Sequence, residues 1–366
     1  MSKIRENEFF PDYLVRPGEI LADYLDDLCM TQAELADRTG LSKKTINEII
    51  SGKSQLTPET ARKLEKVLGR PAHFWSNLER QYQDDKARIA ERERMESSKE
   101  WLKRFCVKKM TDLGWLPKSK DKVEQADALL RFFGIASYDQ WETVFQEYQV
   151  SYRKTTRFQF SVESLSAWLR RGEILARGFS CAPYNRAGFQ KVLGEIRCLT
   201  REKPDFFVPR LKELCASVGV VVLFVPELPK CGVYGATRWV GNKAVIQLSM
   251  RYKSNDQLWF TFFHEAGHIL KHGRKEVFIE FSGTDSGKEE EEADAFAQDK
   301  LIPPSRLRSF VDKKSFSRGD IIAFADEIGI APGIVLGRLQ HDGILPFNHF
   351  LNNELKIFYS DWEECA

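Results

Sequence analysis

The segment that most constrains the fold of this chain is His264-Glu265-Ala266-Gly267-His268. Apolar residues around it recur at helical spacing, and histidines four positions apart lie one turn apart on one face of a helix. Both imidazoles can then bind one tetrahedral zinc ion, while Glu265 flanks the open coordination position. In that place Glu265 takes a proton from a water activated by the metal and delivers it to a leaving amine. The motif therefore predicts a hydrolytic zinc site, with a purely structural zinc site as the alternative.

The third zinc ligand is expected from a second helix. His272 lies about 12 Å along the helix axis from the first histidine, too far to share its metal on a continuous helix. The run of glutamates that opens the predicted helix 289–302 offers Glu290, which shares a face with small residues and with Asp294. Asp294 could orient a ligating imidazole. Glu292 is the second choice, because its face carries a phenylalanine instead.

Short β-branched runs ahead of the motif predict strands at 219–225, 233–237 and 244–250. The strand 244–250 is a candidate to pair with an extended peptide along the cleft. Tyr234 and His272 are candidates to stabilise the tetrahedral oxyanion.

The sequence HEAGH followed by ExxADAFAQDKLIPP resembles the ImmA/IrrE family of zinc-dependent endopeptidases over roughly residues 205–305. The Glu-xxx-Asp spacing is also similar to that of thermolysin-like enzymes. This resemblance implies Zn²⁺ as the cofactor, an α+β zincin-like domain and a protein or peptide substrate, such as a repressor or an antitoxin.

A second constellation lies near the N-terminus. Thr31-Gln32-Ala33-Glu34 has the form of a capping box, Gly40 supplies a turn, and Ser42 is the next helix N-cap. Ile46 and Ile49 are expected to face inward, which leaves Lys43, Lys44, Thr45 and Asn47 near the exposed start of the second helix. This is the outline of a helix-turn-helix whose second helix carries residues suited to reading a DNA groove.

The stretch MTQAELADRTGLSKKTINEIISGKSQLTPETARKLEKVLG resembles the helix-turn-helix of XRE-family regulators, and the flanking RPGEIL and HFWSNL resemble the HigA antitoxin branch. The resemblance covers about residues 12–83. It implies a homodimer that reads an inverted-repeat operator in double-stranded DNA, and a toxin as a further partner. The implied DNA contacts are Gln32, Ser42, Lys43, Lys44, Thr45 and Asn47.

Charge and composition narrow the classes of partner. Lysine and arginine number 55 against 53 acidic residues, so nucleic-acid binding has to come from a local patch. No apolar stretch approaches the ~20 residues that span a bilayer, and the first residues are polar, which predicts a cytoplasmic protein without membrane partners. The seven cysteines form no CxxC pair, which favours reduced thiols.

These patterns predict a multidomain, mostly α protein: an all-α helix-turn-helix bundle at 12–83, a helical middle at 84–204, the α+β zincin-like domain with a small sheet at 205–305, and a helical extension at 306–366. The extension contains a second helix-turn-helix outline at 318–340. Its apolar spacing favours packing over DNA binding, since Arg338 is the only cation of its second helix.

Three functions fit the two constellations. In the first, both domains are active, giving a DNA-binding regulator with a zinc endopeptidase. In the second, the chain is a DNA-binding antitoxin whose metallopeptidase fold serves as a non-proteolytic sensor. The third is a peptidase whose N-terminal module binds protein instead of DNA.

Overall fold

The computed structural model describes residues 14–97, 99–145, 161–249, 254–274, 277–281 and 287–359. They divide into two compact units. Those within Met1–Glu100 and Asp121–Ala126 form unit 1, and those within Trp101–Lys120 and Asp127–Ala366 form unit 2. Both units are rich in helix and unit 2 contains one small sheet, so the predicted multidomain, mostly α architecture is confirmed.

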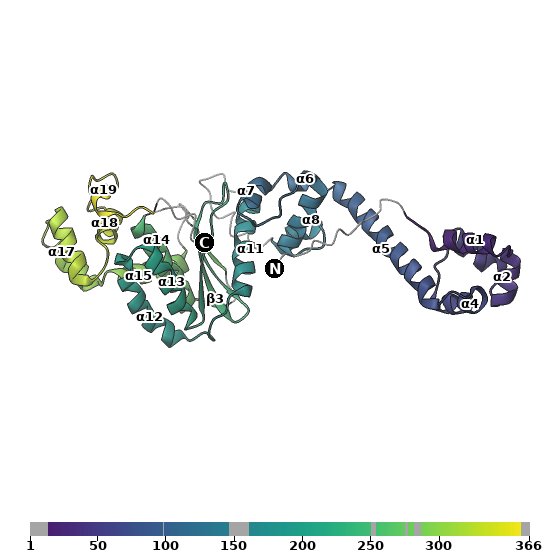
Figure 1. Cartoon of the computed structure of the whole chain (residues 1–366). Coiled ribbons are helices and arrows are strands. Elements are labelled where there is room, and N and C mark those ends of the chain that lie inside the picture. Colours follow the sequence, from purple (N-terminus) through teal and green to yellow (C-terminus); the bar gives the residue numbers. More distant parts are fainter. Residues whose placement is uncertain are drawn as a thin grey trace. The chain divides into compact units, whose positions relative to one another are not determined.

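Unit 1 is a bundle of helices (Figure 1): α1 Pro17–Asp27, α2 Gln32–Thr39, α3 Lys43–Ile50, α4 Pro58–Leu68 and α5 Ala72–Ser97. Helix α2 begins after Thr31, whose hydroxyl accepts a hydrogen bond from the Glu34 N–H at 3.1 Å. Only this half of the predicted capping box forms, because the Glu34 carboxylate pairs with Arg38 at 2.5 Å.

The core of unit 1 fixes the position of α3. Ile46 and Ile49 are buried as predicted, and Trp75 of α5 is fully buried beside them. Helix α1 approaches α3 at Gly18, where a Cβ would collide with the backbone carbonyl of Ile49. Because Ile46 and Ile49 point inward, the opposite face of α3 is left to solvent.

Unit 2 is larger and its helices are α6 Lys99–Leu102 (which begins in unit 1), α7 Val107–Asp112, α8 Lys122–Phe133 (whose first turn lies in unit 1), α9 Asp139–Val144, α11 Val162–Gly178, α12 Arg186–Cys198, the 3₁₀ turn Leu199–Arg201, α13 Pro204–Ala216, α14 Asn255–Lys271, α15 Lys288–Leu301, α16 Pro304–Val311, α17 Arg318–Ile328, α18 Pro332–His341 and α19 Asn352–Leu355. Its strands are β1 Val220–Phe224, β2 Val233–Val240, β3 Lys243–Leu248 and β4 Phe278–Phe281.

The four strands form a mixed sheet in the order β1-β3-β2-β4, with β1 and β3 parallel and the other pairs antiparallel. Figure 1 shows β3 with α11 on one side and α13 and α14 on the other. All five residues of β1 are buried, as expected for a strand covered on both faces.

The sheet corrects the prediction that the strand 244–250 pairs with a peptide. Strand β3 is hydrogen-bonded to β1 on one edge and to β2 on the other, so it has no free backbone edge. The end of the predicted strand, Met250, lies outside the described residues. The edge strand nearest α14 is instead β4, which was not among the predicted strands.

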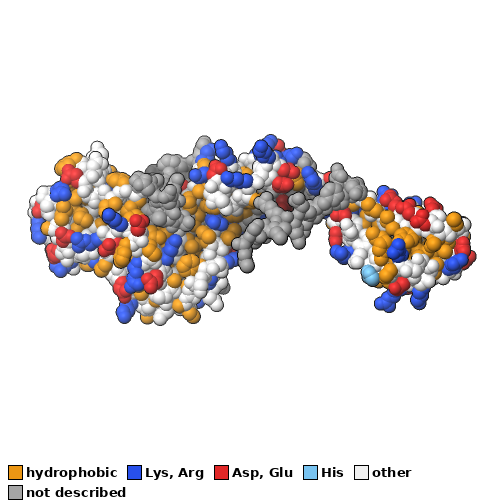
Figure 2. Space-filling view, viewed as in Figure 1, with side chains coloured by type: hydrophobic (Ala, Val, Ile, Leu, Met, Phe, Trp, Pro, Cys, Tyr) orange, Lys and Arg blue, Asp and Glu red, His pale blue; other side chains and the backbone are white. Residues whose placement is uncertain are grey.

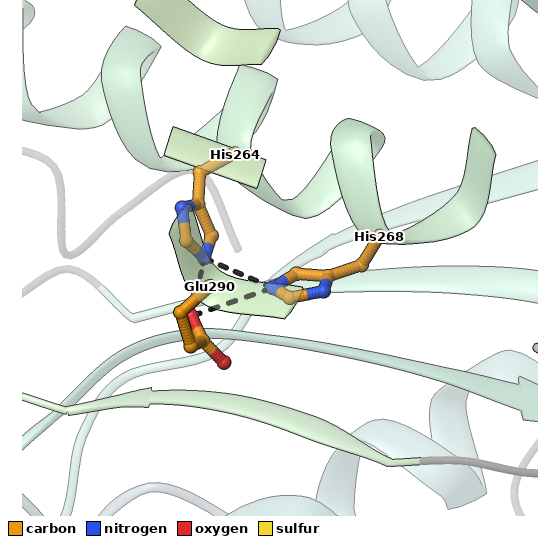
Figure 3. Close-up of side chains that lie close together, drawn as sticks. All are labelled: His264, His268 and Glu290. Atoms are coloured by element: carbon orange, nitrogen blue, oxygen red, sulfur yellow. Dashed lines mark hydrogen bonds and ion pairs between the residues drawn. The ribbon is translucent and has the colours of Figure 1, made fainter. Parts of the chain in front are cut away.

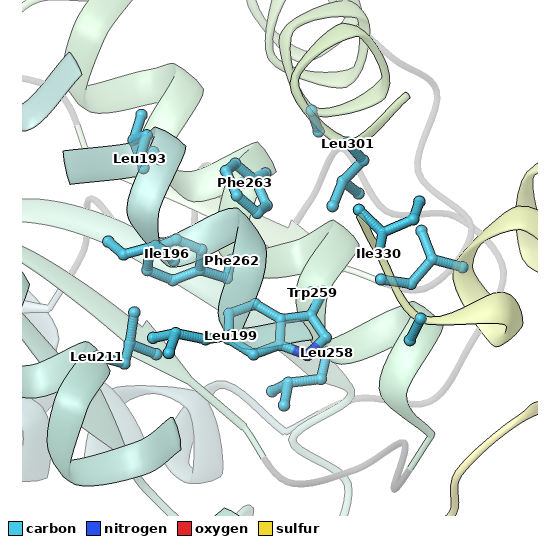
Figure 4. Packing of buried hydrophobic residues seen from close by; sticks show 14 of the residues in the cluster. Leu193, Ile196, Leu199, Leu211, Leu258, Trp259, Phe262, Phe263, Leu301 and Ile330 are labelled. Carbon is cyan, nitrogen blue, oxygen red and sulfur yellow. The ribbon is translucent and has the colours of Figure 1, made fainter. Parts of the chain in front are cut away.

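One hydrophobic core holds α12–α19 together (Figure 4). Trp259, Phe262 and Phe263 of α14 are buried in it, beside Leu301 of α15 and Ile330 before α18. The C-terminal helices contribute further buried residues to the same core, namely Ile321, Phe324, Ile334, Val335 and Leu339. Their apolar spacing therefore reflects packing around the helices that carry the candidate site.

Candidate metal centre and nucleic-acid interface

The histidine motif lies in the C-terminal half of α14, a helix that is buried along most of its length. His264 and His268 are each 2% exposed, and Glu265 is fully buried. Helix α15 packs closely on α14 because small residues meet at the crossing: a Cβ on Gly267 would lie 3.2 Å from the Cα of Ala293. This close approach brings the glutamate run of α15 within reach of the two imidazoles.

Two imidazole nitrogens of α14 and one carboxylate oxygen of α15, all atoms of the kind that binds metals, converge on one point (Figure 3). The Nε2 atoms of His264 and His268 lie 3.0 Å apart, and Glu290 Oε2 lies 3.0 Å from the first and 3.5 Å from the second. Donor atoms that share a tetrahedral zinc at about 2.1 Å are separated by roughly 3.4 Å. The spacing and the N/O donor set therefore fit a zinc ion held by these three residues.

Neighbouring groups orient both imidazoles through their other ring nitrogens. His264 Nδ1 lies 2.8 Å from Asp294 Oδ1, and His268 Nδ1 lies 3.0 Å from His272 Nδ1. The ring of Phe278 from β4 stacks on His268 with centroids 4.1 Å apart. Such contacts hold the Nε2 lone pairs toward a shared ligand.

Glu265 occupies the position expected of a general base. It is buried next to the histidines, and among the described residues neither carboxyl oxygen has a hydrogen-bond partner. Gly235 of β2 leaves the room for it, since a Cβ there would lie 2.5 Å from Glu265 Oε1. An unpartnered buried carboxylate is costly, so the arrangement suits a group that meets a water or a substrate.

Sequence reasoning missed Glu280, which β4 places beside the same centre. Its carboxyl oxygen lies within 4.8 Å of ligand atoms of His264 and Glu265. Glu280 stands opposite Gly235 in the β2–β4 pairing, next to a bulge at Tyr234. The short run Val277-Phe278-Ile279-Glu280-Phe281, rich in β-branched and aromatic residues, was the signal that could have identified this strand.

The acidic surroundings shift the ionisation of the cluster. Burial alone lowers the pKa of His264, but hydrogen bonds with Asp294 and Glu290 outweigh it and raise this pKa. The pKa of Glu290 is lowered, because its bonds with the two histidines outweigh its burial. Burial raises the pKa of Glu265 and of Glu280 and lowers that of His268. A metal cation bound at this centre offsets the negative charge of the carboxylates around it.

The remaining candidates occupy different positions. Glu292 Oε2 lies 3.5 Å from His272 Nε2 and not in the three-atom cluster. His272 follows the end of α14. Its Nδ1 contacts Nδ1 of His268, so its ring helps to orient the His268 imidazole. Tyr234 lies at the bulge of β2 and lines a cavity that Glu280 also lines.

In unit 1 the six candidate DNA contacts all lie in α2, in α3 or just before α3. Gln32 is the first residue of α2 and is half-buried, whereas Lys43, Lys44 and Asn47 are exposed on α3. Ser42 caps α3, and its hydroxyl lies 2.8 Å from the Thr45 hydroxyl.

Charge is distributed unevenly over unit 1. Figure 2 shows acidic side chains gathered over α1, whose exposed positions include Asp23, Asp26 and Asp27. The first turn of α3 instead presents Lys43 and Lys44 without an acidic residue. A polyanion is repelled by the first surface and attracted by the second.

No helix in the described part of the chain combines the length and the apolar composition that a membrane span requires.

Two segments of the chain match known families. Residues 21–75 match a family described as helix-turn-helix, and residues 215–319 match one described as an IrrE N-terminal-like domain. The second range contains both histidines and Glu290. These matches confirm the resemblances inferred from the motifs.

Individual relatives match a smaller part of the chain. The uncharacterized HTH-type transcriptional regulator YddM of Escherichia coli K12 is 38% identical over 64 residues, which are 18% of this chain and 68% of YddM. A putative antidote protein of a plasmid maintenance system from Nostoc punctiforme PCC 73102 is 36% identical, and the match covers 23% of this chain and 92% of that structure with a TM-score of 0.23.

Two further solved structures match similarly. A HigA-family addiction module antidote protein from Coxiella burnetii is 31% identical, and the match covers 23% of this chain and 91% of that structure with a TM-score of 0.22. The antitoxin HigA of Pseudomonas aeruginosa, solved with the higBA promoter, is 28% identical, and the match covers 23% of this chain and 94% of that structure with a TM-score of 0.22. Through its N-terminal domain this chain belongs to the XRE-type helix-turn-helix family of regulators, and its C-terminal region carries an IrrE/ImmA-like peptidase domain.

Proposed function

We propose that the protein is a DNA-binding transcriptional regulator whose IrrE/ImmA-like domain is a zinc-dependent endopeptidase. The observation that carries the proposal is the convergence of His264 Nε2, His268 Nε2 and Glu290 Oε2, with buried Glu265 beside them. A structural zinc site has no need of Glu265, the fourth residue of this group, whose carboxyl oxygens have no hydrogen-bond partner among the described residues. The target is a protein or peptide, such as a repressor or an antitoxin.

The chain's residues divide the chemistry as follows. When bound, zinc supplies Lewis-acid activation of a water molecule and of the substrate carbonyl. Glu265 accepts a proton from the attacking water at a carboxyl oxygen and passes it to the departing amine. Asp294 accepts a hydrogen bond from the Nδ1–H of His264 and keeps that ring in the ligating tautomer, with its proton on Nδ1. Among the described residues no strand pairs with β4 on the side away from β2, so this edge is our proposed binding place for extended substrate backbone.

For unit 1 we propose a homodimer that binds an inverted-repeat operator and has a toxin as an alternative partner. The exposed Lys43, Lys44 and Asn47 at the start of α3 support this assignment, with Gln32, Ser42 and Thr45 beside them. Lysines neutralise phosphates and asparagine can form paired hydrogen bonds with adenine. We keep the domain limits that the sequence predicts: 12–83 for the helix-turn-helix bundle, 84–204 for the helical middle, 205–305 for the zincin-like domain and 306–366 for the helical extension. The proposed location is the cytoplasm.

The enzymatic half is tested on the full-length protein. We expect one zinc per chain by elemental analysis and its loss in His264→Ala. β-Casein, an unfolded protein probe, should be cut by the zinc-loaded protein, and mass spectrometry should detect the new termini. Glu265→Gln should keep its zinc and lose about 10²–10⁴-fold in rate.

The outcomes separate the competing functions. Full zinc occupancy without any cleavage favours the antitoxin whose metallopeptidase fold is a non-proteolytic sensor. Selection from a random duplex library should yield an inverted repeat with the wild-type protein. If no sequence is enriched while cleavage persists, the N-terminal module binds protein instead of DNA.

A further inference from the structure

A cavity of about 270 Å³ lies in unit 2 beside the candidate metal centre. Helices α14, α15 and α18 and strands β2 and β4 contribute to its walls. Glu280 belongs to both sites: it lines the cavity, and its carboxyl oxygen lies within 4.8 Å of ligand atoms of His264 and Glu265. A peptide bound at the centre can therefore place a neighbouring side chain in this cavity.

Much of the cavity wall is hydrocarbon. Phe260 of α14, Leu301 of α15, Ile334 of α18 and Phe347 all line it. Such walls fit a side chain with a long apolar stem, because burial of its methylene groups is favourable.

The unpartnered polar atoms of the cavity residues are all hydrogen-bond acceptors. Among the described residues that line it, the buried side-chain atoms without a partner are Asp256 Oδ1, Glu280 Oε2 and Gln340 Oε1. Asp256 is 9% exposed and Gln340 is 1% exposed. The orientation of Gln340 follows from its Nε2, which donates to the Asn352 Oδ1 at 2.9 Å and to the Pro346 carbonyl at 3.1 Å.

The cations of the cavity wall are already engaged. Lys356 Nζ lies 2.7 Å from Asp256 Oδ2, and Arg338 Nε lies 2.8 Å from Asp342 Oδ2. No lysine or arginine of the described chain forms an ion pair with Glu280. The cavity thus has apolar walls and an acidic residue, Glu280, that forms no ion pair with a described lysine or arginine, which suits a ligand side chain that has an apolar stem, donates hydrogen bonds and carries positive charge.

We propose that this cavity binds an arginine or lysine side chain of the substrate next to the scissile bond, with Glu280 facing its cationic group. The inference rests on the proposed peptidase function and names its substrate class: proteins with a basic residue beside the cleavage site. Glu280 is then a specificity-determining residue, and its removal should change the choice of substrate more than the chemistry.

The test measures binding without turnover. Full-length, zinc-loaded Glu265→Gln protein is titrated into fluorescein-labelled alanine heptapeptides with either arginine or its neutral isostere citrulline at the centre. We expect the arginine peptide to bind at least about tenfold more tightly, as a buried charged hydrogen bond provides. Adding Glu280→Gln should abolish this preference, whereas adding Glu291→Gln, an exposed acid on α15, should preserve it.

Equal binding of the two peptides, or a preference that survives Glu280→Gln, overturns the inference. Loss of zinc in Glu280→Gln also overturns it, because Glu280 would then be a metal ligand. Mapping of β-casein cleavage separates the two proposals. Cleavage without enrichment of basic residues beside the cut bonds rejects the cavity assignment and leaves the peptidase. An arginine preference in a wild-type protein that cuts nothing rejects the peptidase and leaves the cavity.

Discussion

His264 lies between two acidic residues of α15, and this placement decides its ionisation. Asp294 contacts Nδ1 and Glu290 contacts Nε2, so in the metal-free protein the imidazole holds its proton more firmly than a free histidine does. Zinc has to displace that proton, because only the neutral ring is a ligand. The depressed pKa of Glu290 and the lowered pKa of His268 mean that those ligands are already deprotonated near neutral pH.

We therefore predict that zinc binding at pH 7.5 releases about one proton per chain. A histidine with the ordinary pKa of about 6.5 is only about a tenth protonated there and would release about 0.1 proton. Because the pKa of His264 is raised, its protonated form persists as the pH rises above 6.5. Calorimetric titrations in buffers of different ionisation enthalpy measure the number, and a value near 0.1 contradicts the prediction.

Among the structural elements, β2 and α14 have to approach closely for Glu265 to reach the centre. Gly235 permits this, since a Cβ there would lie 2.5 Å from Glu265 Oε1 and 2.8 Å from Thr261 Cγ2. The same residue pairs with Glu280 across β2 and β4, so the positions of both Glu265 and Glu280 depend on Gly235.

Gly235→Ala should destabilise the protein by about 1–3 kcal/mol, as overpacked core positions do, and should slow hydrolysis by displacing Glu265. Urea unfolding and β-casein cleavage measure the two effects. Gly194→Ala is the matched control: at this exposed glycine inside α12 an added Cβ would meet no atom within 4 Å, so alanine should be neutral or stabilise by up to about 1 kcal/mol. Equal behaviour of the two variants would show that the contact at Gly235 is unimportant.

For the whole molecule, the two proposed activities use residues in separate compact units. The DNA candidates lie in α2 and α3, and the metal candidates lie in α14 and α15. Each unit has its own hydrophobic core, so a surface change in one is not expected to alter the stability of the other.

Lys43→Ala/Lys44→Ala should thus weaken DNA binding while zinc content and β-casein cleavage stay at wild-type values. If each lysine neutralises one phosphate, the double variant removes four such contacts from the proposed homodimer, and the slope of log affinity against log salt should become less steep by about 3.6. Anisotropy titrations at several salt concentrations measure this slope. As a control, Lys288→Ala removes an exposed lysine of α15 in unit 2 and should leave it unchanged. An unaltered slope in the double variant would remove these lysines from the DNA interface.

Local patterns were sufficient to predict the elements that carry the site. The four-residue spacing of His264 and His268, the N-caps Thr31 and Ser42, and the apolar period of α14 and α15 are properties of neighbouring residues, and a helix converts such spacing directly into a shared face. The β-branched runs likewise predicted β1–β3.

Contacts between distant segments were decided only by the tertiary structure. Glu290 faces the histidines while Glu292 faces His272, a distinction that depends on how α15 crosses α14. Strand β4 is only four residues long, yet its pairing with β2 brings Glu280 to the centre. Strand β3 has no free edge because it lies between β1 and β2. Helix periodicity states which residues share a face, but the rotation and the pairing of packed elements are set by side-chain volumes across the interface, which a linear pattern does not contain.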